Sequence, residues 1–263
     1  MTNSTHEELA RRIRNAYVGG VVPSMRDVLE PTDVEAAYAV QELNTRYWVG
    51  AGRRIVGRKV GLTAKAVQAQ FGVAQPDFGV LFADMEVADG GVLSVSKCLQ
   101  PKAEAEVALV LRADIDDVDA TPDTVAAAVG EVAAAIEVVD SRIADWKITF
   151  ADTVADNGSS AFYVLSNSRV PLRGLDLRTC GMALEVNGEV ASLGAGVACL
   201  GHPLNAAAWL ARVLARRGQP LRRGHVVLTG ALGPMVTLRP GDRVQASIGG
   251  LGTVRFSYED GEP

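Results

Sequence analysis

Hydrophobic residues at helical spacing characterise the first fifty residues of the chain. Leu9, Ile13 and Tyr17 recur on one face of a helix, and Ser4 or Thr5 precedes them. Either hydroxyl is a candidate N-cap, because its oxygen can accept a hydrogen bond from an N–H of the first turn. The pattern predicts a helix that ends at the following pair of glycines.

A second helix is predicted to begin at the Pro-Thr-Asp sequence of residues 31–33. Ala36, Val40, Leu43 and Tyr47 would form its apolar stripe. Acidic residues near its start, where the helix dipole is positive, favour the same assignment. Residues 1–50 are therefore predicted to form a helical subregion.

From residue 54 onward, β-branched residues and glycines replace the helical pattern and predict strands separated by turns. The Asn187-Gly188 pair is a strong hairpin signal, because both residues tolerate the left-handed backbone of a tight turn. Strands are predicted over residues 55–63, 92–99, 102–112, 133–142 and 162–166, with hairpins over residues 183–190 and 236–259.

Two helices interrupt the predicted strands. Residues 122–130 predict a short helix, and residues 203–217 predict a longer one. The longer helix carries Ala207, Leu210 and Leu214 at the spacing of a core-facing stripe.

Two further segments are predicted as loops: residues 73–85 over a binding site, and residues 152–160 as either a capping turn or a ligand-contact loop. Residues 73–85 contain a Pro-Asp turn, and residues 152–160 are rich in small polar side chains. A helical start followed by many strands with few crossovers indicates an α+β fold with a curled or barrel-like sheet. The simplest organisation is one unit over residues 1–263, with residues 51–263 forming a β-rich catalytic region.

Composition and charge narrow the possible partners. The net charge is −5 and no basic stripe is present, which argues against nucleic acid as a partner. The most apolar stretch, residues 125–139, contains Glu131 and Glu137, so no membrane span is expected. Three widely spaced cysteines and a charged N-terminus without an apolar run favour a reducing cytoplasm.

The clearest chemical feature is a pair of glutamates in an apolar strand. Glu104 and Glu106 are two residues apart, so their side chains share one face of the predicted strand. Glu137 interrupts a second apolar strand. Adjacent buried carboxylates need a cation, and Mg²⁺ or Mn²⁺ prefers carboxylate oxygens. The alternative is a solvent-facing strand edge with salt bridges, and spacing alone leaves both open.

Lys59 and Asp77 are candidates for proton transfer. Lys59 lies in a glycine-flanked strand, where it is either a surface charge or a group held near a site. Asp77 is either a turn residue or a proton acceptor. Four residues are candidates for a substrate-facing wall and are equally compatible with a plain core: Phe78, Leu81, Phe82 and Trp146. The glycine-rich segment around Thr229 could hold an anion with backbone N–H groups.

Several long blocks together resemble one family. GRRIVGRKVGLT, FGVAQPDFGVLFADM, LQPKAEAEVALVL, AIEVVDSRIADW, DTVADNGSS, CLGHPLNAAAWLAR and GQPLRRGHVVLTGALGPM occur in this order, as in the 2-keto-4-pentenoate hydratases of the fumarylacetoacetase-like superfamily. The resemblance extends from about residue 5 to residue 256. It implies a mixed β-roll with outer helices, and the hydration of 2-hydroxypenta-2,4-dienoate to 4-hydroxy-2-oxopentanoate in meta-cleavage catabolism of aromatic compounds.

The resemblance also implies roles for individual residues. A divalent cation, Mg²⁺ or Mn²⁺, would be held by Glu104, Glu106 and Glu137, and would act as a Lewis acid toward the 2-oxo acid substrate. Lys59 and Asp77 would transfer protons. The substrate would be bound by Ser159, Ser160, Thr229 and Leu81. A homo-oligomer, either a pentamer or a decamer, is expected.

Three other functions compete with the hydratase. A 4-oxalocrotonate decarboxylase of the same superfamily would use a similar metal site to release CO₂. Hydrolysis of acylpyruvate-type carbon–carbon bonds would need an early histidine, and none lies between His6 and His202. A non-catalytic protein that binds a metal and an organic acid is the third alternative.

Overall fold

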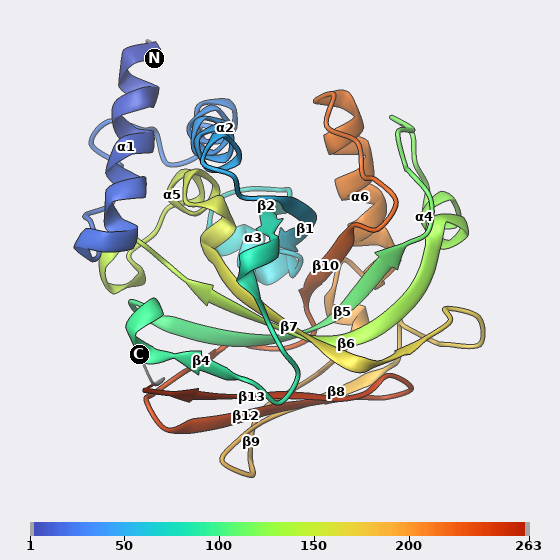
Figure 1. The fold of residues 1–263 in the computed structure, drawn as a ribbon. Helices are drawn as coiled ribbons and strands as arrows, with labels where there is room; N and C mark the ends of the chain where they lie inside the picture. Colours follow the sequence, from blue (N-terminus) through green and yellow to red (C-terminus); the bar gives the residue numbers. More distant parts are fainter. Residues whose placement is uncertain (1–2, 261–263) are drawn as a thin grey trace.

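The computed structural model describes residues 3–260 and contains two β-sheets with helices around the larger one (Figure 1). The larger sheet has the strand order β2-β1-β10-β5-β6-β7-β3, and β11 pairs with β5. Its strands are β1 (Ile55–Gly61), β2 (Asp77–Phe82), β3 (Glu86–Val87), β5 (Pro101–Leu111), β6 (Val129–Asp140), β7 (Ser160–Val170), β10 (Val226–Ala231) and β11 (Val236–Thr237).

The smaller sheet lies beneath the larger one in Figure 1 and has the order β4-β13-β12-β8-β9. Its strands are β4 (Val92–Ser94), β8 (Gly181–Val186), β9 (Glu189–Ala195), β12 (Asp242–Ile248) and β13 (Gly252–Glu259). Strand β13 packs against β6 and β7, so the outer face of the curled sheet is buried. The predicted hairpins at residues 183–190 and 236–259 correspond to β8–β9 and, at the chain end, to β12–β13.

Helices flank the open side of the curled sheet (Figure 1). The α-helices are α1 (Asn3–Gly19), α2 (Val34–Gly50), α3 (Lys65–Gln70), α4 (Pro122–Ala128), α5 (Phe150–Ala155) and α6 (Pro203–Arg216). Short 3₁₀ turns are η1 (Ala83–Met85), η2 (Val95–Lys97), η3 (Ala144–Trp146), η4 (Asn157–Ser159) and η5 (Gly196–Ala198). The predicted α+β class with a curled, barrel-like sheet and outer helices is confirmed.

Helices α2 and α6 begin near the residues that the sequence predicts, and α6 buries its predicted apolar face. Asp33 caps α2, where its carboxylate accepts a hydrogen bond from the N–H of Ala36. In α6, the predicted stripe of Ala207, Leu210 and Leu214 is completely buried. Burying a leucine side chain of this kind stabilises the fold by about 2 kcal/mol.

The concave face of the larger sheet combines small and large apolar side chains. Ala108, Ala133 and Ala135 occupy its centre, and Tyr163 and Leu228 pack beside them. Small side chains at the centre leave room for the sheet to curl. At one end of this face, the same strands carry the charged residues described below.

The two predicted loops prove to be ordered elements. Asp77 begins β2, which pairs antiparallel with β1 along its whole length, so a prediction of a loop over residues 73–85 is wrong for its second half. Residues 152–160 contain the end of α5, turn η4 and the first residue of β7. Thr149 caps α5 by accepting from the N–H of Asp152, a signal that the polar composition concealed.

Smaller corrections concern element ends. Ser4 and Thr5 lie within α1, and Tyr47 is 53% exposed and lies off the buried stripe of α2. The strand predicted over residues 92–99 ends at Ser94, and the helix predicted over residues 122–130 ends at Ala128. Helix α3 was not predicted. No helix in the described part of the chain is long and apolar enough to cross a membrane.

Candidate active site

Three glutamates converge at one end of the concave face. Strands β5 and β6 are antiparallel neighbours, and their register places Glu104 directly opposite Glu137. Glu106 lies two residues further along β5 on the same face. One carboxylate oxygen from each of the three residues lies within 4.8 Å of the other two. Three acidic side chains from two strands are thus brought together.

Burying these carboxylates without hydrogen-bond partners costs free energy unless a cation balances their charge. Glu106 and Glu137 are fully buried, yet Glu106 Oε1 and both carboxylate oxygens of Glu137 accept no hydrogen bond. Burial, followed by the neighbouring Glu137, raises the pKa of Glu104 to about 7 and raises the pKa of Glu106 well above its usual range. The unpartnered oxygens of Glu106 and Glu137, together with a nearby carboxylate oxygen of Glu104, fit a hard divalent cation, whose charge would offset the repulsion among them.

Lys59 provides a positive charge beside the cluster. Its side chain is only 3% exposed, and its Nζ lies 3.5 Å from Oε1 of Glu137. Burial lowers the pKa of Lys59, but Glu137, Asp77 and the other carboxylates raise it more, so the net direction is upward. The ammonium form is therefore the one that this environment favours.

Asp77 lies at the start of β2, directly opposite Gly61 of β1. It is 2% exposed, and burial raises its pKa despite the nearby charge of Lys59. Its Oδ1 accepts no hydrogen bond in the described structure. A carboxylate and an ammonium group are thus held next to the glutamate cluster, where water is largely excluded.

Thr229 lies in β10, which pairs with the strand that carries Glu104 and Glu106. Its side chain is buried, and its hydroxyl donates to the carbonyl of Val107 at 2.9 Å. The register between β10 and β5 shifts between Leu228 and Ala231, so the regular alternation of a strand is interrupted here. The backbone N–H of Gly230 donates to Oε2 of Glu106 at 2.7 Å. Backbone N–H groups of this glycine-rich segment were expected to hold an anion, and the anionic group that the N–H of Gly230 contacts is the carboxylate of Glu106. Substrate binding by Thr229 stays a prediction.

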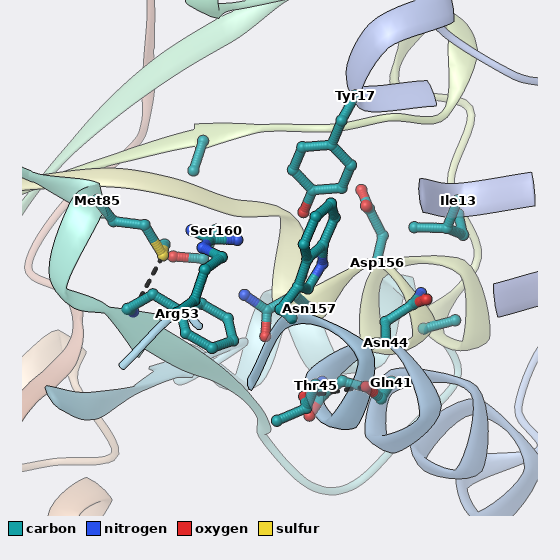
Figure 2. Close-up of a pocket in the computed structure, with 14 residues that line it drawn as sticks. Ile13, Tyr17, Gln41, Asn44, Thr45, Arg53, Met85, Asp156, Asn157 and Ser160 are labelled. Carbon is teal, nitrogen blue, oxygen red and sulfur yellow. Dashed lines mark hydrogen bonds between the residues drawn. The ribbon is translucent and has the colours of Figure 1, made fainter. Parts of the chain in front are cut away.

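The two serines lie in different surroundings. The hydroxyl of Ser159 is buried and lies 3.2 Å from that of Thr153. Ser160 lines a small cavity of about 30 Å³ between the helices α1 and α2 and the barrel, together with Asn44 and Trp48 (Figure 2). Its Oγ is buried without a hydrogen-bond partner. The roles predicted for both serines stay predictions.

The four residues that were candidates for a substrate-facing wall lie in different surroundings. Leu81 shares the face of Asp77 on β2 and packs in the apolar cluster of the concave side. Phe78 turns to the other side and stacks on Tyr38, with ring centroids 4.4 Å apart. Phe82 packs under the guanidinium of Arg53.

Trp146 packs beside Lys102, a neighbour of Glu104 on β5. The ammonium of Lys102 lies 4.2 Å from the centre of its ring, and Lys102 shares a face of β5 with Glu104. The indole N–H donates to the carbonyl of Gln100, which fixes the ring at this edge of the site.

The curled mixed sheet thus holds three glutamates together, with a lysine and an aspartate beside them, an arrangement of acceptor oxygens that fits a divalent cation.

Comparison with known proteins places the chain within a family. Residues 50–257 match the family described as fumarylacetoacetate (FAA) hydrolase C-terminal. The chain belongs to the fumarylacetoacetate hydrolase family. This is the superfamily that the sequence blocks resembled.

Individual relatives are similar over almost their whole length. A 2-keto-4-pentenoate hydratase from Paraburkholderia xenovorans (strain LB400) is 48% identical, over 100% of this chain and 98% of the relative. 2-Keto-4-pentenoate hydratase 2 from Dechloromonas aromatica (strain RCB) is 53% identical, over 97% and 98%. The structure of 4-oxalocrotonate decarboxylase from Pseudomonas putida G7, complexed with magnesium and adipate, has a TM-score of 0.94 and 37% identity, with 98% of each chain covered.

Proposed function

We propose that this protein hydrates 2-hydroxypenta-2,4-dienoate to 4-hydroxy-2-oxopentanoate in the meta-cleavage breakdown of aromatic compounds. The observation that carries the proposal is the buried cluster of Glu104, Glu106 and Glu137 with Lys59 and Asp77 beside it. The identity of 48% to 53% to proteins named as hydratases, against 37% to the decarboxylase, favours water addition over loss of CO₂.

The three glutamates are the proposed holders of Mg²⁺ or Mn²⁺. Their carboxylate oxygens, of which those of Glu137 and Oε1 of Glu106 have no hydrogen-bond partner, are ligands of the type that either ion prefers. When bound, such an ion acts as a Lewis acid that stabilises negative charge on oxygens of a 2-oxo acid.

Lys59 and Asp77 are the proposed proton-transfer pair. Hydration adds one proton at carbon 5 of the dienoate and one hydroxyl at carbon 4, and the enol proton on the 2-oxygen is lost while carbon 3 gains a proton. The net change is the gain of one water molecule, and the product is the 2-oxo acid. The water loses a proton to a base of the site as the substrate gains one from an acid, and the pair returns to its starting protonation. Burial of both groups, at 3% and 2% exposure, keeps bulk water from competing for these protons.

The proposal also covers the oligomeric state, the location and the partners of the protein. A homo-oligomer, a pentamer or a decamer, in the cytoplasm is proposed, with no nucleic-acid or membrane partner. Exposed apolar side chains on the edge strand β9 support an oligomer, since Val190 is 56% exposed and Leu193 is 66% exposed. One unit over residues 1–263 remains part of the proposal.

Two substitutions on β6 test the metal assignment. Glu137→Gln removes a charge from the cluster, and Glu131→Gln removes one from a side chain that is 52% exposed on the same strand. Calorimetric titration with Mn²⁺ should give at least a hundredfold weaker binding for the Glu137 variant, together with loss of dienoate turnover. The Glu131 variant should match the parent protein. Unchanged Mn²⁺ affinity in the Glu137 variant would rule out this ligand set.

A further inference from the structure

Glycine backbone encloses the side chain of Lys59 on several sides. A Cβ atom at Gly61 would lie 2.2 Å from Oδ1 of Asp77 and 3.2 Å from Nζ of Lys59. At Gly79 it would lie 3.3 Å from Cγ of Lys59, and at Gly158 2.8 Å from Cε and 3.2 Å from Nζ. No space remains for a side chain at these positions, so the lysine is packed lengthwise against main chain.

Gly158 reaches Lys59 from turn η4, which lies far from β1 in the sequence. The amide of Asn157 in this turn pairs with the backbone of Val80 in β2, accepting from its N–H at 2.7 Å and donating to its carbonyl at 3.0 Å. Gln41 of α2 links the same regions a second time, because its amide donates to the carbonyl of Phe78 in β2 and to that of Val154 in α5. Figure 2 shows Gln41 on helix α2 and Asn157 on turn η4, both lining the neighbouring cavity.

The far side of the turn is fixed by a buried ion pair. Arg142 donates to the carboxylate of Asp156 through its backbone N–H and its Nε, and to the carbonyls of Asp156 and Ser160 through its guanidinium. Between these anchors, Asn157, Gly158 and Ser159 all have positive φ, at 57°, 62° and 54°. Three consecutive left-handed residues are unfavourable and persist where the surroundings enforce them, which is typical of functional sites.

We propose that turn η4 is a positioning device for Lys59. Gly158 contacts the lysine, and Asn157 holds Gly158 in place by clipping the turn to β2. The ammonium is thereby directed toward Glu137 and Asp77 and cannot turn away from the carboxylates. This inference rests on the proposed function only in that Lys59 takes part in proton transfer.

Gly158→Ala, with Gly218→Ala as its matched control, tests the contact. Gly218 has nearly the same backbone, with φ of 68° against 62°, but no atom lies within 4 Å of its Cβ position. Both variants carry the same backbone cost, and only the first displaces Lys59. Gly158→Ala should lose about 10²-fold in kcat, the scale of a 1 Å misplacement, with KM and Mn²⁺ affinity changed less than threefold. Gly218→Ala should keep the parent kcat, and an equal loss in both variants would overturn the proposal.

A second readout is independent of the reaction. Lys59→Ala removes the Cε atom that an alanine at position 158 would strike. Gly158→Ala should therefore lower the Tm by about 3 °C more in the parent protein than in the Lys59→Ala background. Equal falls in both backgrounds would overturn the contact, even if the dienoate proved not to be the substrate. Coupling in Tm with no turnover of any dienoate would leave the contact supported and would refute the proposed function.

Asn157→Ala provides an independent variant should Gly158→Ala fail to fold. Asn187 is its matched control, because it also has a left-handed backbone, with φ of 55°, and its amide also makes two hydrogen bonds, to Asp242 and Arg243. Asn157→Ala should lower kcat at least tenfold with unchanged Mn²⁺ affinity, and Asn187→Ala should lower only the Tm. A kcat at the parent level in Asn157→Ala would contradict the clip.

Discussion

Lys59→Met tests whether the lysine balances the glutamates or competes with a cation for them. The Nζ of Lys59 lies 3.5 Å from Glu137, and both side chains are almost fully buried. At an effective dielectric constant near 20, a pair at this distance attracts by about 5 kcal/mol. Removing one partner of a buried pair leaves the other uncompensated and costs about 3–5 kcal/mol, so the metal-free variant should lose stability on that scale.

The same charge opposes a divalent ion, and its loss should strengthen metal binding. Mn²⁺ affinity should rise at least tenfold in Lys59→Met while kcat falls by at least 10²-fold. Urea unfolding with and without Mn²⁺ measures the change in stability, and calorimetric titration measures the change in Mn²⁺ affinity. Mn²⁺ should recover most of the lost stability in the variant.

Lys147→Met is the control for loss of a lysine charge. Lys147 pairs with Asp145 at 3.0 Å, but both side chains are more than 70% exposed. Solvent screens such a pair, so the stability change should stay below about 0.5 kcal/mol and Mn²⁺ affinity should not change. Weaker Mn²⁺ binding in Lys59→Met would refute the reasoning, because it would make the lysine a support of the metal site and not its competitor.

Two further predictions concern stability. Burial, followed by the charge of Arg58, lowers the pKa of His225 to about 4 from its ordinary value of 6.5. Below pH 6.5 the unfolded chain takes up a proton that the folded chain refuses, so between pH 7 and pH 4 the parent protein should lose about 2 kcal/mol relative to His225→Asn in urea unfolding. A pH-independent difference would contradict this. Leu210→Ala should cost about 2–5 kcal/mol by leaving a cavity under α6, whereas Leu193→Ala, at a side chain 66% exposed, should change stability by less than about 0.5 kcal/mol; equal effects would contradict the assigned core.

Local periodicity was enough to predict part of the site. The alternation of a strand places Glu104 and Glu106 on one face whatever their surroundings. That Glu137 lies opposite Glu104 depends on the register between β5 and β6, which non-local packing determines. The apolar pattern around Glu137 made it a candidate third carboxylate, and the family resemblance supplied its grouping with the other two.

Other features were hidden from local reasoning for identifiable reasons. The first turn of α5 is polar because Thr149 and Asp152 form a capping pair, and this composition resembles that of a loop. Asp77 follows a proline, a common turn signal, yet it pairs with β1. The contact of Gly158 with Lys59 joins segments about a hundred residues apart, and nothing in either segment indicates it.

The most direct test of the proposed function follows the ultraviolet absorbance of freshly generated 2-hydroxypenta-2,4-dienoate in the presence of Mg²⁺, Mn²⁺ or EDTA. The proposal predicts rapid decay with either ion, formation of 4-hydroxy-2-oxopentanoate and no decay with EDTA. Absence of decay with metal, accompanied by release of CO₂ from 4-oxalocrotonate under the same conditions, would contradict hydration and assign the site to decarboxylation.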